Sequence, residues 1–215
     1  MLSLSPAELV QAVIIIVISL TAHEFGHSLM AIRLGDETPR RDGRLTLNPL
    51  AHIDIIGFIM LVVAGFGWAK PVRIDPRALR KPQRDEILIS IAGPLANILL
   101  AVVAALIVRA AVAAGGSMSR ALLVGVFNVF TRAAAINVSL ALFNLLPIPP
   151  LDGSHLVTTW LGKANMQLAV TYFRYGSLAL LALIVIERVA NVDLLPIGRL
   201  TMSVVTWFYG LLGIR

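Results

Sequence analysis

The residues best suited to chemistry are His23, Glu24 and His27, which form the pattern H-E-x-x-H inside a long apolar stretch. In a helix, positions i and i+4 share one face, so both imidazoles can reach the same ion. Zinc accepts two imidazoles and a carboxylate as ligands and keeps a fourth position for water. Glu24 can take a proton from that water while the ion polarises a carbonyl group. The pattern therefore predicts metal-dependent hydrolysis of a peptide bond.

The third ligand must come from another part of the chain, and Asp152 is the best candidate. It follows a proline-rich stretch that cannot continue a regular helix, and Gly153 comes directly after it. Without the H-E-x-x-H pattern, Asp152 would be interpreted as a helix cap or an ordinary loop aspartate. The H-E-x-x-H pattern favours the interpretation of Asp152 as a metal ligand. The ionisable groups of that pattern lie within a membrane span, where each costs roughly 2.5–3.5 kcal/mol, and such groups are functional by default.

Composition places the chain in a membrane. Of its 215 residues 58% are hydrophobic and 14% are charged, and the mean hydropathy is +0.85. A soluble domain has about 45–50% apolar and about 25% charged residues, so a soluble enzyme, a disordered tail and a fibrous repeat are all excluded. The absence of cysteine excludes disulfides and cysteine-based metal sites. We expect one compact integral membrane domain.

Apolar runs long enough to cross a bilayer predict an all-α, polytopic transmembrane helix bundle. The predicted spans are residues 9–32, 87–108, 121–146 and 167–187. The run 194–213 fits either a short span or an interfacial helix. Residues 53–67 are too few for a span and predict a re-entrant hairpin, with an edge strand that could pair with an extended substrate.

Basic residues set the expected orientation. Segments 33–52 and 68–86 together hold ten of the eighteen lysines and arginines, so both should lie on the cytoplasmic side. The first helix then runs inward, and its two histidines lie near its cytoplasmic end. Asp152 follows the third span at the same end. The orientation was assigned without these residues, yet it brings them to a similar depth.

Several further motifs carry a family resemblance. The chain resembles the site-2 protease family of intramembrane zinc metalloproteases, in its compact bacterial and archaeal subgroup without PDZ or CBS domains. The resemblance covers most of residues 9–155. It rests on the H-E-F-G-H motif at 23–27, G-P-x-x-N at 93–97, N-x-x-P-x-P-x-x-D-G at 144–153, and the stretches 48–54 and 65–71.

The resemblance implies a role for each matching residue. His23, His27 and Asp152 would be ligands of Zn²⁺ and Glu24 the general base, held in a three-helix catalytic core. The substrate would be a membrane protein, cut in or near a transmembrane segment. The chain would form a single protease domain over 1–215, with its catalytic core at about 9–155 and C-terminal helices at 156–215. Lipid and a regulatory membrane partner are further expected partners, and nucleic acid is not.

For three polar residues, two interpretations remain open. Asn97 and Asn144 lie in apolar helices, where a side-chain amide could contact the substrate and its developing oxyanion or make an interhelical hydrogen bond. His52 precedes the predicted hairpin and could bind the open position of the metal or line the entrance. A metal- or proton-coupled small transporter, using the same ionisable cluster, is the alternative function.

Overall fold

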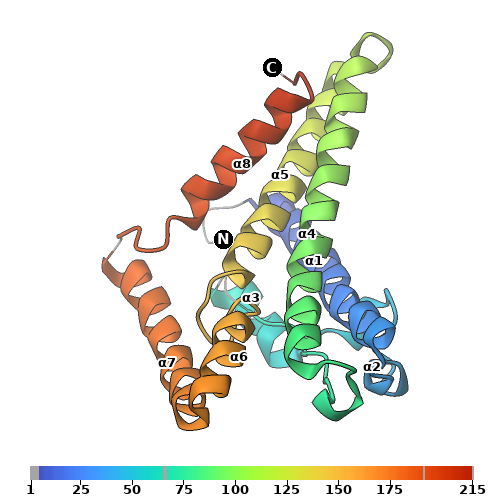
Figure 1. The fold of residues 1–215 in the computed structure, drawn as a ribbon. Helices are drawn as coiled ribbons and strands as arrows, with labels where there is room; N and C mark the ends of the chain where they lie inside the picture. Colours follow the sequence, from blue (N-terminus) through green and yellow to red (C-terminus); the bar gives the residue numbers. More distant parts are fainter. Residues whose placement is uncertain (1–4, 65–66, 191, 215) are drawn as a thin grey trace.

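The computed structural model describes residues 5–64, 67–190 and 192–214, and in these ranges it contains helices and no strand (Figure 1). The prediction of an all-α fold is confirmed. The α-helices are α1 (Pro6–Leu34), α2 (Thr38–Arg41), α3 (Ile55–Ala64), α4 (Pro82–Ala113), α5 (Arg120–Asn144), α6 (Ser154–Ala164), α7 (Met166–Ala190) and α8 (Ile197–Leu211). Short 3₁₀ turns occupy Pro49–Ala51, Pro76–Ala78 and Gly115–Ser117.

Four of the described helices, α1, α4, α5 and α7, are long and apolar enough to cross a membrane. They correspond to the four predicted spans. The sequence marks where α1 begins and ends: Ser5 and Glu8 form a capping box at its start, and Gly35 ends it with a φ of 112°. Helix α8 has 15 residues and is therefore about 22 Å long, too short to cross about 30 Å of hydrocarbon unaided.

The central helices α1, α4 and α5 lie side by side (Figure 1). Small residues allow α1 and α4 to approach closely, because a Cβ on Gly26 would lie 2.7 Å from the carbonyl oxygen of Ala92. Helix α8 covers α5, where Tyr209 donates a hydrogen bond to Thr131 (2.7 Å). On the remaining side, α6 packs against α7. The three central helices thus form the packed core that positions the site.

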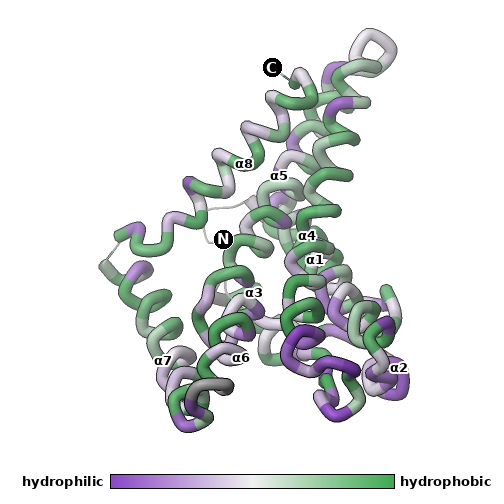
Figure 2. The backbone as a smooth tube through the Cα atoms, in the orientation of Figure 1, coloured by the Kyte–Doolittle hydropathy of each residue, from purple (hydrophilic) through white to green (hydrophobic). Residues whose placement is uncertain are grey.

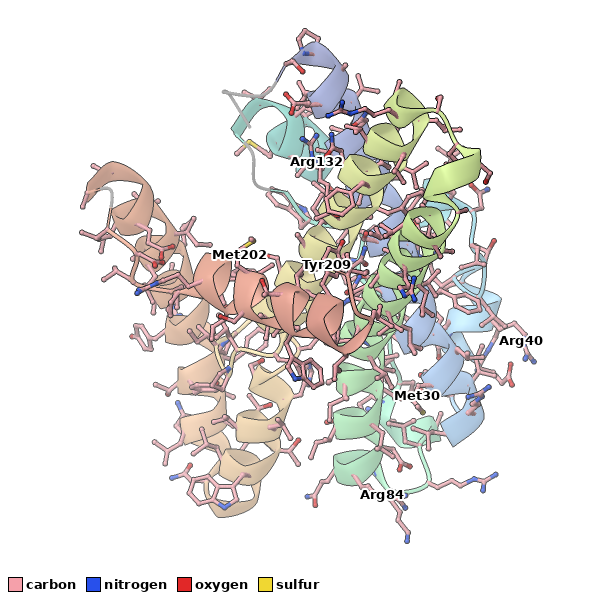
Figure 3. All side chains as sticks on the ribbon, turned by 90° about the horizontal axis from the view of Figure 1, so that it is seen from above. Met30, Arg40, Arg84, Arg132, Met202 and Tyr209 are labelled. Atoms are coloured by element: carbon pink, nitrogen blue, oxygen red, sulfur yellow. The ribbon has the colours of Figure 1, made fainter. Side chains whose placement is uncertain are left out.

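Polar and apolar surfaces are separated along the bundle. Hydrophilic residues gather at the end where α1 finishes and α4 begins, while the helices above are largely hydrophobic (Figure 2). Val10, Ile14 and Ile18 line one exposed face of α1 at helical spacing. Arg132, in α5 (labelled in Figure 3), is paired with Glu8 at the start of α1 (2.8 Å). This is the surface of a membrane protein.

The segment between α2 and α4 corrects one expectation. Its ends meet, because Ile53 forms an antiparallel bridge with Ala69, and Arg44 donates to the carbonyl oxygens of Ala51 and Lys70. The run between them is helix α3 rather than a strand, so its N–H groups bond within the helix. The prediction of an edge strand within 53–67 is therefore wrong. A short apolar run does not distinguish helix from strand by periodicity.

Candidate metal centre

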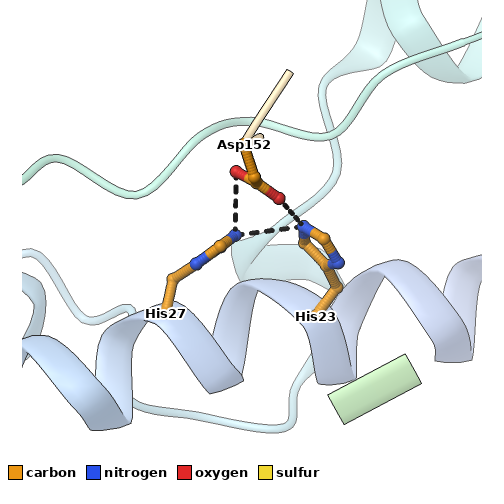
Figure 4. Close-up of side chains that lie close together, drawn as sticks. All are labelled: His23, His27 and Asp152. Atoms are coloured by element: carbon orange, nitrogen blue, oxygen red, sulfur yellow. Dashed lines mark hydrogen bonds and ion pairs between the residues drawn. The ribbon is translucent and has the colours of Figure 1, made fainter. Parts of the chain in front are cut away.

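Three side chains from two distant parts of the chain converge at one point (Figure 4). The Nε2 atoms of His23 and His27 lie 3.0 Å apart. Asp152 faces both, with Oδ2 at 3.1 Å from His23 Nε2 and Oδ1 at 3.4 Å from His27 Nε2. Among the described residues, these three form the group of histidines and acids able to hold a metal ion. Both histidines are buried.

Hydrogen bonds on the far side of His23 fix its tautomer. Its Nδ1 lies 2.7 Å from Oδ1 of Asn97. The amide nitrogen of Asn97 donates to the carbonyl oxygen of Ser19 (3.1 Å) and to Oδ1 of Asn137 (3.0 Å), so its own Oδ1 must be an acceptor. His23 Nδ1 therefore carries the proton. In the neutral ring, Nε2 is left with a lone pair that points at Asp152.

The same argument applies to His27. Its Nδ1 lies 2.7 Å from the carbonyl oxygen of Ile89, which can only accept, so Nδ1 again carries the proton. When both rings are neutral, two imidazole lone pairs and a carboxylate face one another. Zinc at its usual 2.0–2.1 Å from nitrogen and oxygen would set neighbouring ligand atoms roughly 3.3 Å apart in a tetrahedron. The observed 3.0–3.4 Å is close to that spacing, so the donor set fits the ion.

Gly93 of α4 gives the two rings their space. A Cβ there would lie 2.5 Å from Cε1 of His27 and 2.7 Å from Nε2 of His23, far inside contact distance. Sequence reasoning recorded Gly93 only as part of a motif and gave it no role. A glycine before a proline within an apolar helix was the available signal.

The loop that carries Asp152 is closed by its neighbours. The backbone N–H of Gly153 donates to the carbonyl oxygen of Asn144 (2.7 Å). A Cβ on Gly153 would collide with the backbone of Leu145, so only glycine fits. The side chain of Asn144 donates to Leu140 in its own helix (3.0 Å). Asn144 therefore contributes its backbone to the loop while its amide group stays on α5.

Glu24 is buried beside the cluster, and the segment that follows α3 reaches it. Its Oε2 accepts a hydrogen bond from the backbone N–H of Val72 (3.2 Å). Sequence reasoning did not find Val72, because an irregular segment gives no periodic signal. Residues 70–75, which we call the strap, are irregular in conformation and pass along α1.

Side chains pin the strap at several points. Asp36, which is fully buried, accepts from the N–H of Asp75 (2.8 Å), and Arg73 makes two 2.9 Å bonds to Asp42. Burial raises the pKa of Asp36, but its hydrogen bonds from Thr38 and Asp75 outweigh this and lower the pKa overall. Asp36 is thus an ionised anchor of the strap.

His52 lies outside the metal-capable group of described residues. It is buried, and its Nε2 donates to the carbonyl oxygen of Thr46 (2.9 Å). This hydrogen bond holds the ring within the polar loop before α3.

The comparisons with known proteins agree with this geometry. The model of peptidase family M50 matches residues 11–114 and 110–186. The chain is 42% identical over 145 residues to a Bacillus subtilis protein named "Putative zinc metalloprotease YwhC", covering 67% of this chain and 66% of that protein. It is 28% identical over 206 residues to "Putative zinc metalloprotease Rip2" of Mycolicibacterium smegmatis, covering 91% of this chain and 71% of that protein.

The Mycobacterium tuberculosis protein of the same name is 34% identical over 143 residues, which is 63% of this chain and 51% of that protein. The matches thus span from about half to just over two thirds of these relatives. No solved structure matches the chain. The family model covers most of the chain, including the three central helices, the two histidines and Asp152. The chain belongs to peptidase family M50.

Proposed function

We propose that this protein is an intramembrane zinc metalloprotease that hydrolyses peptide bonds in or near transmembrane segments of its substrates. One observation carries the proposal. Nε2 of His23, Nε2 of His27 and the carboxylate of Asp152 face a common point, while the Nδ1 atom of each ring is engaged on its far side. Such a cluster is stable when a cation occupies its centre. His23, His27 and Asp152 are the ligands of that ion.

The remaining residues of the site have separate roles in hydrolysis. A zinc ion held by His23, His27 and Asp152 would polarise the scissile carbonyl and lower the pKa of a water toward about 7. Glu24 accepts the proton of that water at its carboxylate and passes it to the departing amine. The N–H of Val72 holds Oε2 of Glu24 in place before the substrate arrives. The low accessibility of Glu24 keeps the proton transfer away from bulk water.

Asn97 acts as a positioning residue. Its Oδ1 fixes the ring of His23, and both of its amide hydrogens are engaged by Ser19 and Asn137. It therefore has no free donor for an oxyanion. The interhelical hydrogen-bond interpretation is therefore favoured for Asn97, whereas the amide group of Asn144 makes one bond, to Leu140 in its own helix.

The apolar helices and the basic loops support a proposed placement in the membrane. The protein is multi-pass in the cell membrane, and the site lies near the cytoplasmic end of α1, beside the arginine-rich segments after α1 and before α4. Its substrate is a membrane protein whose segment unwinds at the site, because a helix hides its carbonyls in hydrogen bonds. A membrane partner selects that substrate, and the whole chain acts as one domain.

Metal analysis combined with peptide cleavage tests the proposal. Purified wild type should hold about one zinc and cut a model transmembrane peptide. Glu24→Gln should hold zinc and lose turnover, and Asp152→Ala should lose both. A coupled transporter would instead show metal- or pH-dependent flux with no cleavage, and membership of a peptidase family does not favour it. Cleavage that persists in Glu24→Gln would overturn the assignment.

A further inference from the structure

A small cavity lies between α1 and the segment that contains α3. Its volume is about 20 Å³, which is room for little more than one water molecule. Its walls are mainly apolar, with Leu20 from α1 and Phe58 and Leu61 from α3. Polar side chains also line it, among them Thr21, His52 and Asp54. The cavity is therefore an apolar hollow with a few polar atoms in its wall.

His52 brings an unpaired acceptor to this cavity. Its Nε2 donates to the Thr46 carbonyl, so Nδ1 holds the lone pair. The residue is 1% exposed, and Nδ1 has no hydrogen-bond partner among the described residues. Thr21 cannot supply one, because its hydroxyl donates to the carbonyl oxygen of Val17 (2.7 Å). Buried acceptors are almost always paired, so this atom requires a donor from outside the described chain.

The cavity and the metal centre share the same two walls. Thr21 precedes Glu24 by three residues and so lies on the same face of α1, about 4.5 Å along its axis. On the opposite wall Ala69 lines the cavity, and Val72, three residues later, bonds Glu24. An extended chain advances about 3.3 Å per residue. A substrate cut at the metal centre would therefore place a side chain at the cavity within about three residues of the scissile bond.

We propose that this cavity is a specificity pocket for one small, hydroxyl-bearing side chain of the substrate. The hydroxyl donates to Nδ1 of His52, and the apolar walls contact the carbon atom that carries it. Leucine or phenylalanine is too large for the pocket, and alanine leaves Nδ1 unpaired. The inference rests on the proposed protease function and adds a preference for serine at one substrate position.

The test uses the zinc-loaded full chain in detergent with model transmembrane peptides. Each position within three residues of the cut is set in turn to alanine, serine, valine or leucine, and kcat/KM and the cut site are measured. At one position, kcat/KM for the serine peptide should exceed that for the alanine peptide by about 10-fold, which is the factor expected from one buried hydrogen bond. The leucine peptide should be cut least.

Two variants assign that preference to the cavity. His52→Leu should abolish the serine-over-alanine ratio at that position, while alanine peptides are still cut. Leu61→Ala should enlarge the pocket. It should raise kcat/KM for the leucine peptide relative to the alanine peptide at that position by about 10-fold. Leu180→Ala, which truncates a buried leucine of α7 away from the cavity, is the matched control and should keep the wild-type profile. If His52→Leu fails to fold, as judged by zinc content, the Leu61→Ala profile decides alone.

The results separate this inference from the protease assignment. If Glu24-dependent cleavage is present but the residue preferences are the same in wild type and Leu61→Ala, the pocket is refuted and the protease stands. A serine preference that survives in folded His52→Leu also refutes it. If zinc-loaded wild type cuts no peptide at all, the protease assignment fails and the pocket fails with it.

Discussion

Nδ1 of His23 lies 2.7 Å from Oδ1 of Asn97, and this contact joins the metal centre to the helix bundle. The amide nitrogen of Asn97 continues to Ser19 in α1 and to Asn137 in α5. One buried side chain on α4 therefore bonds residues of the other two central helices, α1 and α5. The orientation of a metal-facing imidazole is set by helix packing, which explains why the site needs the bundle as well as the H-E-x-x-H sequence.

Asn97→Ala should weaken zinc binding about 10- to 100-fold, because a ligand that loses its orienting partner binds metal less well. The affinity can be measured by competition with a zinc chelator. Asn144→Ala is the matched control, since its amide group bonds only the backbone of its own helix among the described residues. A zinc affinity for Asn97→Ala equal to that of the control would remove the positioning role.

Gly93→Ala should abolish zinc binding, because the added methyl group would occupy the space of both imidazole rings. Gly125→Ala on α5 is the control, since a Cβ there meets no atom within 4 Å. That control should keep its zinc and gain about 0.5–1 kcal/mol of helix stability. Zinc content and thermal unfolding of the two proteins provide the comparison. Full zinc occupancy in Gly93→Ala would show that the helices can separate to make room.

Much of this arrangement could be predicted from local sequence. The spans follow from hydropathy, and His23 and His27 follow from their i, i+4 spacing in one of them. Asp152 was predicted from a different argument, because the charge bias of the loops places its segment at the same end of the bundle as the histidines. The structure brings these three residues together as the prediction requires.

Other features depend on contacts that no local pattern records. Helix α3 was expected to include a strand, since ten apolar residues fit either structure. The bond from Val72 to Glu24 joins residues 48 positions apart, through a segment with no repeating pattern. The role of Gly93 depends on which side chains face it across two helices. Such relationships are set by tertiary packing.

Acid should release the strap. The pKa of Asp36 is lower in the folded protein, so its stabilising effect is present above the pKa of the unfolded chain and is lost as pH falls through the folded value. Limited proteolysis of residues 70–75 should therefore accelerate at low pH. Asp36→Asn should already be cut faster at neutral pH and should show a weaker pH dependence. An unchanged cleavage rate in Asp36→Asn would show that Arg73 and the other contacts hold the strap alone.

Val72→Pro should reduce kcat about 10-fold or more and leave zinc content unchanged. Proline lacks the N–H that Val72 donates to Glu24, so the carboxylate would lose the bond that orients it toward the water. Val72→Ala is the matched control, because it removes most of the side chain and keeps the N–H, and it should retain near wild-type kcat. Val72 lies outside any helix or strand, so proline there interrupts no regular element. Equal losses in the two variants would mean that the valine side chain matters and that the hydrogen bond to Glu24 does not.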